Sequence, residues 1–288
     1  MNIQKINKHA YGYPPQFRTI PSPPKLLYAA GAIDLVYNTD LPWVAIIGTR
    51  NPTRYGIDVT HRLASELARG GIVIVSGLAL GIDAVAHKAA VALGKPTVAV
   101  LPSGLNNIYP ASHYKLAGQI VANGGLLISE YAAHVTSFKQ FFIARNRLIS
   151  GLSDGVVVTE AAIDSGTNHT VKFAQDQNKQ IMAVPGNITS FSSAGSNNQL
   201  RLGAAAVTSA SDILNVLGYG KELHMQPIKA DSREEGVLIE LLQSGITQSQ
   251  DLIERSQLSA SQFANIIGLM EIGGKVMSLG GGHWTIRR

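Results

Sequence analysis

Between residues 43 and 184, short apolar runs alternate with segments that have the spacing of helices. The apolar runs show no polar alternation, which is typical of strands buried on both faces. Repeated strand–helix units of this kind predict a parallel, doubly wound α/β sheet with right-handed crossovers. The expected strands are Val44–Ile47, Ile72–Val75, Thr97–Leu101, Leu126–Ser129, Val156–Thr159 and Ile181–Val184. The expected helices are Tyr55–Arg69, Ile82–Leu93, Ser112–Asn123, Gln140–Gly151 and Thr167–Gln177.

Composition changes on both sides of this alternating region. Residues 1–40 begin with several prolines, which forbid long regular structure. They are interpreted as a lead-in segment that packs on the main domain, with one short helix over Lys25–Asp34. Residues 41–218 are expected to form the main domain. Residues 219–232 mix Gly, Pro, Lys and Glu without periodicity and are predicted to be a linker.

The last segment, residues 233–288, is predicted to be a small C-terminal winged-helix domain. It contains three helical stretches, Glu234–Gln243, Thr247–Arg255 and Ser259–Ile272, followed by a hairpin that turns at Gly280–Gly282. Winged helices often bind DNA with the third helix, but Ser259–Ile272 contains no Lys or Arg. Because Lys and Arg contacts to phosphate supply most non-specific affinity for DNA, we expect this domain to contact protein.

The chain carries a formal net charge of +5, which is unevenly distributed. Residues 1–230 hold 19 Lys and Arg against 12 Asp and Glu, whereas residues 231–288 hold 5 against 7. The main body is therefore expected to bind a polyanion. The chain has no cysteine, which excludes disulfides and thiolate metal sites. With no apolar run of about 18 residues and no apolar leader, a cytoplasmic location is expected.

The stretch Ser76–Asp83 is the centre of the expected site. A buried strand ends there, Gly77 and Gly81 let the backbone turn, and a helix starts at Ile82. Backbone N–H groups and the helix dipole at such a turn favour a bound anion, most often phosphate. The alternative is an ordinary strand–helix turn in which the glycines only relieve backbone strain.

Small or polar residues follow nearly every predicted strand. Ligands of doubly wound sheets bind beyond the carboxyl ends of the strands, so these residues are expected to form one shallow rim. The sequence has no G-x-G-x-x-G after the first strand and no G-x-x-x-x-G-K-[ST], so the usual dinucleotide and nucleoside triphosphate sites are unsupported. The rim residues are Gly48–Arg50, Ser76-Gly77, Pro102–Gly104, Ser129-Glu130, Glu160 and Pro185-Gly186.

The stretch Ser137–Arg147 interleaves aromatic residues with three cations. Bases stack on aromatic rings while cations follow the phosphates, which is how proteins hold a single strand without reading its sequence. This stretch therefore predicts contact with a single-stranded nucleic acid. The alternative is that Phe141 and Phe142 belong to the core and that the arginines cap a helix.

Arg145 and Arg147 are two residues apart, so on a helix they point to different faces. One is expected to bind the ligand while the other pairs with Glu130, Glu160 or Asp164, and both assignments stay open. The two glutamates, which follow strands, form either a carboxylate pair or, more simply, ion pairs with these arginines.

Three further polar groups have two interpretations each. Ser165-Gly166-Thr167 opens a helix and is either a second anion site or a helix cap. Gly195–Asn197, in a loop rich in Ser and Asn, either supplies polar contacts or forms a turn. Asp83 and His87 have helical i, i+4 spacing and predict a local hydrogen bond in preference to a catalytic pair. The histidines are scattered, so no catalytic residue, metal or cofactor is expected.

A series of short motifs runs through the chain. Its members are Gly48-Thr49-Arg50, Ser76-Gly77-x-Ala79-x-Gly81-Ile82-Asp83, Ala86-His87, Tyr109-Pro110, Ser129-Glu130, Phe142-x-x-Arg145-Asn146-Arg147, Glu160-Ala161, Ser165-Gly166-Thr167 and Pro185-Gly186. In this order and spacing, from about Tyr13 to Leu217, the series resembles the DNA-processing protein A family (DprA/Smf). The final segment is similar to the winged helix that many members carry.

The resemblance implies an extended Rossmann domain that binds single-stranded DNA and has no known catalytic activity. It also implies a homodimer that protects incoming strands during natural transformation and helps to load the RecA recombinase. Carried over by position, the DNA-binding residues would be Gly48, Thr49, Arg50, Ser76, Gly77, Ala79, Gly81, Lys139, Phe142, Arg145, Asn146, Arg147, Ser165, Gly166 and Thr167.

Three positions depart from the pattern of the family. Ile143 stands where a proline commonly follows the phenylalanine, Asn168-His169 replaces an apolar pair, and Gln199 occupies a position that is normally apolar. The alternative function is a nucleotide-metabolising enzyme on a related Rossmann scaffold, similar to the phosphoribohydrolases. Those carry P-G-G-x-G-T-x-x-E, and here Thr170 stands where the catalytic glutamate would be.

Overall fold

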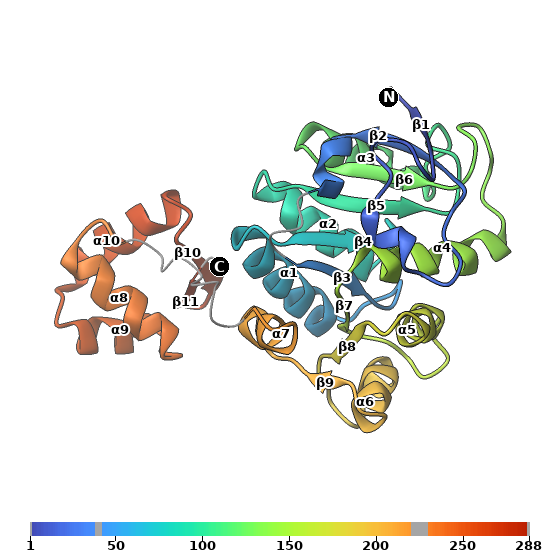
Figure 1. Ribbon diagram of the computed structural model, residues 1–288. Helices are drawn as coiled ribbons and strands as arrows, with labels where there is room; N and C mark the ends of the chain where they lie inside the picture. Colours follow the sequence, from blue (N-terminus) through green and yellow to red (C-terminus); the bar gives the residue numbers. More distant parts are fainter. Residues whose placement is uncertain (1, 38–41, 220–229, 287–288) are drawn as a thin grey trace. The chain divides into compact units, whose positions relative to one another are not determined.

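The computed structural model describes residues 2–37, 42–219 and 230–286 (Figure 1). The chain divides into two compact units, Met1–Leu223 and His224–Arg288. Most of the predicted linker, residues 219–232, lies outside the described residues. Within the described residues, no helix has the length and apolar character needed to cross a membrane.

The first unit is built on a sheet of nine strands, in the order β1-β2-β6-β5-β4-β3-β7-β8-β9 among the described residues. From β6 to β9 along this order, neighbouring strands pair in parallel, so the predicted mostly parallel, doubly wound α/β fold is confirmed. The strands are β1 (Gln4–Asn7), β2 (Leu26–Gly31), β3 (Trp43–Ile47), β4 (Val73–Ser76), β5 (Thr97–Leu101), β6 (Leu126–Ser129), β7 (Gly155–Val158), β8 (Gln180–Ala183) and β9 (Ala205–Ala206).

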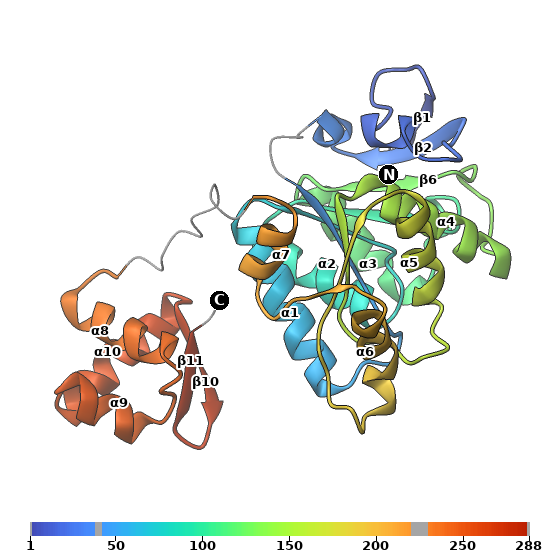
Figure 2. The same cartoon turned by 60° about the horizontal axis from the view of Figure 1, so that its bottom comes forward.

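Helices cover both faces of this sheet (Figure 1 and Figure 2). Successive strand residues point to opposite faces, so Val44 and Ile46 of β3 pack with α1, α2 and α7, whereas Ala45 and Ile47 pack with α4 and α5. The helices are α1 (Arg54–Arg69), α2 (Ile82–Ala92), α3 (Tyr114–Ala122), α4 (Lys139–Leu152), α5 (Thr167–Asp176), α6 (Ala194–Arg201) and α7 (Ala210–Val216). Four short 3-10 helices are η1 (Pro15–Arg18), η2 (Ile33–Tyr37), η3 (Ala111–His113) and η4 (Phe191–Ser193).

The N-terminal segment adds strands to the sheet where a helix was predicted. The prediction of a helix over Lys25–Asp34 is wrong, because Leu26–Gly31 forms β2 and pairs antiparallel with β6. Strand β1 then pairs antiparallel with β2. Without β2, the edge of β6 would expose unpaired N–H and C=O groups. Pairing with these groups overrides the weak helix propensity of Leu26–Gly31. Tyr13 and Phe17 are fully buried in the core that lies beneath.

The second unit is a winged helix, as predicted. Its three helices pack around a core that includes Leu238, Leu252 and Ile267. A capping box between Ser259 and Gln262 starts the third helix. The elements are α8 (Arg233–Gln243), α9 (Ser249–Ser256), α10 (Ala260–Ile272), β10 (Val276–Gly280) and β11 (His283–Ile286).

Strand β3 lies at the point where the order of the strands reverses. From β3 the chain adds β4, β5 and β6 in one direction, and after α4 it continues with β7 on the other side of β3. Ligands of such sheets bind in the crevice at the carboxyl ends of the strands next to this point. The loops after β3 to β7 are therefore the place to look for a site.

Candidate nucleic-acid interface

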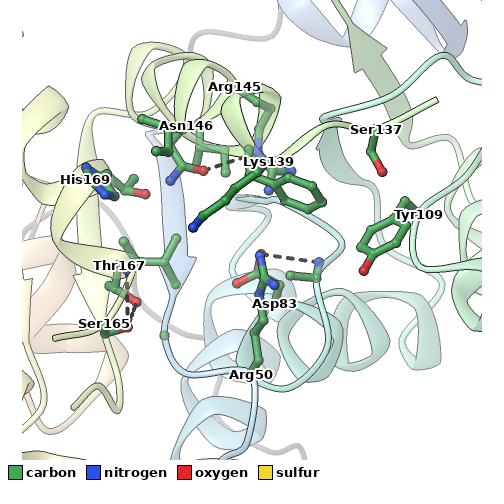
Figure 3. A pocket seen from close by; sticks show the side chains of 18 residues that line it. Arg50, Asp83, Tyr109, Ser137, Lys139, Arg145, Asn146, Ser165, Thr167 and His169 are labelled. Carbon is green, nitrogen blue, oxygen red and sulfur yellow. Dashed lines mark hydrogen bonds between the residues drawn. The ribbon is translucent and has the colours of Figure 1, made fainter. Parts of the chain in front are cut away.

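A pocket of about 700 Å³ lies beyond the carboxyl ends of β3 to β7 (Figure 3). Each of these strands is followed by residues that line it, so the topology gathers segments that are far apart in the sequence. The predicted DNA-binding residues that line it are Gly48, Arg50, Ala79, Lys139, Phe142, Arg145, Asn146, Ser165, Gly166 and Thr167. The predicted residues outside its lining are Thr49, Ser76, Gly77, Gly81 and Arg147.

Some lining residues were not singled out as binding residues from the sequence. Tyr109 follows β5, Ser137 precedes α4, and His169 and Thr170 lie in the first turns of α5. Signals were present, because Tyr109 belongs to a motif of the series and Ser137 begins the aromatic and basic stretch. Neither signal says which way a side chain points, and that direction depends on how the loops pack.

Backbone amides of the loop after β4 bind the side chain of Asp83, which lies at the start of α2. Oδ2 of Asp83 accepts hydrogen bonds from the N–H groups of Gly77, at 3.1 Å, and Ala79, at 3.4 Å. Asp83 lies in the first turn of α2, where a carboxylate is also stabilised by the helix dipole. The amides that were expected to hold a phosphate are therefore occupied by an acid of the protein.

Two glycines let this loop lie close to its neighbours. A Cβ on Gly77 would lie 2.5 Å from the guanidinium nitrogens of Arg145. Gly81 has a φ of +78°, and a Cβ there would overlap the carbonyl oxygen of Thr49. That oxygen also accepts the N–H of Ile82 at 3.1 Å. Gly81 is thus required for contact between the loops after β3 and β4, and Gly77 for contact between the loop after β4 and Arg145 of α4.

The guanidinium of Arg145 is buried under the loop after β4. Arg145 is 4% exposed, and its Nη1 donates to the carbonyl oxygens of Gly77, at 2.6 Å, and Val100. Burial lowers the pKa of Arg145 to about 10, and the Asp83 carboxylate opposes this shift. Burial raises the pKa of Asp83, which the charge of Arg145 opposes in turn. The charges of the two buried side chains compensate each other, and the separate hydrogen bonds of each to this loop hold it in place.

Arg147 points to another side of α4 and forms an ion pair. Its Nη2 donates to both carboxylate oxygens of Glu130 at 2.5 Å, and its Nη1 donates to the carbonyl oxygen of Ser22 at 2.6 Å. The expected pairing of one arginine with an acidic residue is confirmed, and the pair is Arg147–Glu130. This contact also ties the N-terminal segment to α4.

Glu160 has a different role from the one predicted. Its carboxylate accepts hydrogen bonds from the N–H of Thr53 at 2.8 Å and from the Thr53 hydroxyl at 2.6 Å. Thr53 caps α1, so the buried acid sits at a helix N-terminus, where the dipole stabilises it. The predicted ion pair of Glu160 with an arginine is therefore wrong. The described residues also contain no cluster of His, Asp and Glu able to hold a metal ion.

His87 binds Thr97 and makes no hydrogen bond with Asp83. Its Nδ1 lies 2.8 Å from the Thr97 hydroxyl oxygen, and that hydroxyl donates to the carbonyl of Ile74. Nδ1 is consequently the donor, and Nε2 is buried without a partner. Burial lowers the pKa of His87 to about 3. The predicted Asp83–His87 bond is wrong, because Asp83 turns to the amides of the preceding loop.

Two exposed cations face the pocket, Arg50 after β3 and Lys139 at the start of α4 (Figure 3). Cζ of Arg50 lies 5.1 Å from the centre of the Phe142 ring, a cation–π contact. Tyr109 meets the same ring edge-on, with the ring centres 5.3 Å apart. Phe142 is only half-buried, so it belongs to the pocket wall and not to the closed core.

The turn before α5 forms the opposite wall. The Ser165 hydroxyl donates to the Thr167 hydroxyl oxygen at 2.8 Å and accepts the N–H of Thr167 at 3.2 Å. Two departures from the family pattern meet behind it, because Nε2 of Gln199 donates to Oδ1 of Asn168 at 3.2 Å. Nδ2 of Asn168 in turn donates to the Ile163 carbonyl at 2.7 Å. This polar link connects α6 to the turn.

The loop predicted over Gly195–Asn197 is wrong, because these residues lie in α6. The N–H of Gly195 donates to the carbonyl of Ala161 at 2.7 Å, and a Cβ on Gly195 would overlap the next carbonyl, that of Ala162. The composition of this stretch favours a turn, but its close contact with the segment after β7 stabilises it as a helix.

Comparison with known proteins agrees with this geometry. The family model of DNA recombination-mediator protein A matches residues 4–218, and that of the DprA winged helix domain matches residues 223–282. The chain belongs to the DNA processing protein A (DprA/Smf) family. The resemblance that the motifs indicated is confirmed.

Relatives and solved structures of this family match over most of their length. Protein Smf of Escherichia coli is 34% identical over 287 residues, covering 96% of this chain and 75% of that protein. DprA of Streptococcus pneumoniae has a solved structure with a TM-score of 0.69 and 35% identity, covering 75% of this chain and 74% of that one. DprA of Helicobacter pylori has a solved structure described as showing a single-stranded DNA binding mode. Its TM-score is 0.67 and its identity 37%, covering 78% of this chain and 98% of that one.

Proposed function

We propose that this chain is a cytoplasmic single-stranded DNA-binding protein that protects incoming strands and helps to load RecA during natural transformation. It acts as a homodimer and catalyses no reaction. One observation carries the DNA-binding part: two exposed cations, Arg50 and Lys139, face a pocket whose wall contains the half-buried ring of Phe142. Cations beside an aromatic ring suit a single strand, whose phosphates and bases need both.

The charge of the surrounding segment supports a polyanionic ligand. Between Asp83 and Asp154 the chain has a single acidic residue, Glu130, and Arg147 neutralises it. The cations of the same segment are Lys88, Lys95, Lys115, Lys139, Arg145 and Arg147. This segment supplies the pocket walls after β5 and β6, so the local potential there favours phosphate.

The predicted site residues divide into two roles in this proposal. Those that contact the strand are Arg50, Lys139, Phe142, Asn146, Ser165, Gly166 and Thr167, with Gly48 and Ala79 shaping the floor. Those that hold the pocket in place are Thr49, Ser76, Gly77, Gly81, Arg145 and Arg147. The first group lines the pocket, and the second lies outside the lining or, as Arg145 does, spends its donors on hydrogen bonds within the protein.

Arg50→Ala tests the pocket, with oligo-dT binding measured by fluorescence anisotropy. We expect affinity about tenfold weaker or worse, because a guanidinium contact to phosphate is lost. Arg54→Ala is the matched control, since Arg54 is an exposed arginine that pairs with Asp58 outside the pocket lining. Tight binding that Arg50→Ala leaves unchanged would refute the pocket.

Base stacking on Phe142 is tested separately. Phe142→Ala should cost about 1–3 kcal/mol of binding free energy if a base lies on the ring. An unchanged affinity in a folded variant excludes that contact.

The recombination role is tested by following RecA filament assembly on single strands with and without the chain. Arg50→Ala should reduce the stimulation in proportion to its loss of DNA binding.

The absence of catalysis is tested with nucleoside monophosphates, from which no base should be released. Thr170, which is buried, supplies no carboxylate at the position where a phosphoribohydrolase has its glutamate.

The winged helix is proposed to contact protein. The outer face of α10 carries Leu269 and Ile272, which are 63% and 86% exposed, and the helix has no Lys or Arg. Such a face offers no charge to phosphate.

A further inference from the structure

Phe138 is an exposed aromatic residue directly beside the pocket. It precedes α4 and stands between Ser137 and Lys139, which both line the pocket. Phe138 is 56% exposed, yet other rings support it. It meets Phe141 edge-on at 5.3 Å between ring centres, and Phe141 stacks on Tyr131 at 4.0 Å. The ring is therefore held in place by its aromatic neighbours and open on its exposed side, where a planar group can stack.

The loop of Phe138 and the loop of Tyr109 form one continuous wall. The N–H of Gly104 donates to the Val135 carbonyl at 2.8 Å, and the N–H of Asn106 donates to the Ala133 carbonyl at 2.9 Å. In Figure 3, Tyr109 and Ser137 stand on one side of the pocket, opposite Ser165, Thr167 and His169. A strand that leaves the pocket past Tyr109 therefore reaches the neighbourhood of Phe138.

The charge along this wall also suits a strand. Residues 102–115 and 131–144, which form it, include no Asp or Glu. Lys139 follows Phe138 directly and is exposed. An exposed ring beside an exposed cation is the pair of groups that holds a base and its phosphate without reading sequence.

We propose that Phe138, supported by Phe141 and Tyr131, is a second base-stacking platform for a nucleotide just outside the pocket. The platform rests on the proposed function, because it needs a single strand in the pocket. It extends the bound length of the strand along the wall formed by the loops after β5 and β6.

Oligo-dT strands of two lengths test the platform, one of about 4 and one of about 16 nucleotides, which span the site sizes of OB folds that bind single strands. Phe138→Ala should weaken binding of the long strand by about fivefold to tenfold, which corresponds to the lower part of the stacking range. Binding of the short strand, which the pocket holds by itself, should change by less than about twofold, because no base reaches the platform.

Three variants separate stacking from other effects. Phe138→Trp should keep the affinity for the long strand, because an indole also stacks, whereas Phe138→Leu should behave like Phe138→Ala. Phe191→Ala is the matched control, since Phe191 is 72% exposed in the loop after β8 and lies outside the pocket lining. It should leave both affinities unchanged.

An abasic nucleotide moved along the long strand locates the stacked base. At one position it should weaken binding to the wild-type chain and have no further effect on Phe138→Ala. No loss for the long strand, or an equal loss for both lengths, overturns the platform. If the wild-type chain binds neither strand, the proposed function itself fails.

Discussion

The pocket has an inner and an outer group of cations that look alike in the sequence and differ in the structure. On the inner side, Arg145 is buried beside Asp83 and donates to carbonyl oxygens of the protein. On the outer side, Arg50 and Lys139 are exposed and face the pocket. A buried guanidinium has exchanged water for protein partners, so few of its donors remain for an anion. Burial therefore decides which cations serve the fold and which serve the ligand.

This comparison predicts that the two groups affect different measurements. Substitutions on the inner side should lower the free energy of unfolding, and DNA affinity should fall only as far as the pocket loses its shape. Substitutions on the outer side should lower DNA affinity with little change in stability.

The largest effect is expected for Arg145→Met. It leaves Asp83 without its cation and two carbonyls without a donor, so unfolding should become easier by about 3–5 kcal/mol. Urea denaturation measures this change. Arg50→Met should stay within about 0.5 kcal/mol of wild type, as surface substitutions do. If Arg145→Met is as stable as wild type and only DNA binding is lost, the assignment of Arg145 to the fold is wrong.

A second effect concerns His87, which is fully buried on α2, the helix that also carries Asp83. Its pKa is lowered by burial from 6.5 to about 3, so between these values the unfolded chain takes up a proton that the folded chain does not. Stability should thus be retained above pH 6.5 and be lost as pH falls, by about 1.4 kcal/mol per pH unit. Denaturation midpoints of wild type and His87→Gln across this range measure the difference. Equal pH slopes for both chains would contradict the assignment.

A smaller effect is expected for Lys139→Ala on the outer side. Removing one phosphate contact should reduce the slope of log affinity against log salt by about 0.7, the value for single strands. Stability should not change, because Lys139 is exposed. Lys172→Ala removes an exposed lysine outside the pocket lining and is the control. The same salt slope in Lys139→Ala and wild type would remove this residue from the interface.

The smallest effect is expected for Glu130→Gln. The pair with Arg147 is partly exposed, so its loss should destabilise the chain by about 1 kcal/mol. DNA affinity should be unchanged, since Arg147 lies outside the pocket lining. A gain in affinity would mean that Arg147, once released, turns to the strand, and its assignment to the residues that hold the pocket in place would be wrong.

The fold could be predicted because six buried strands appear as uninterrupted apolar runs. The stretch Leu26–Gly31 was misassigned, because its pairing depends on the open edge of β6, which comes about 100 residues later in the chain. The helix over Ala194–Arg201 was missed for a similar reason, since its contact with the end of β7 is not visible in its own Gly, Ser and Asn residues.

The candidate site could be predicted as a set of residues but not as a set of roles. The spacing of Arg145 and Arg147 shows that they point to different sides of a helix, but it does not say which side faces β4 and β5. Likewise, a glycine-rich turn before a helix predicts amides that are free to bind an anion. The sequence does not show that the carboxylate of Asp83, rather than a ligand, accepts hydrogen bonds from those amides. Such choices are made by packing between loops from different strands.

The N-terminal segment has a consequence for where the protein can be shortened. Composition places a boundary at residue 40, yet β1 and β2 cover the edge of β6, and Arg147 holds Ser22. A chain that starts after this boundary would expose a bare strand edge to other molecules, which favours aggregation. Deletion of the first 40 residues should therefore yield poorly soluble material, although the segment contributes no residue to the pocket lining.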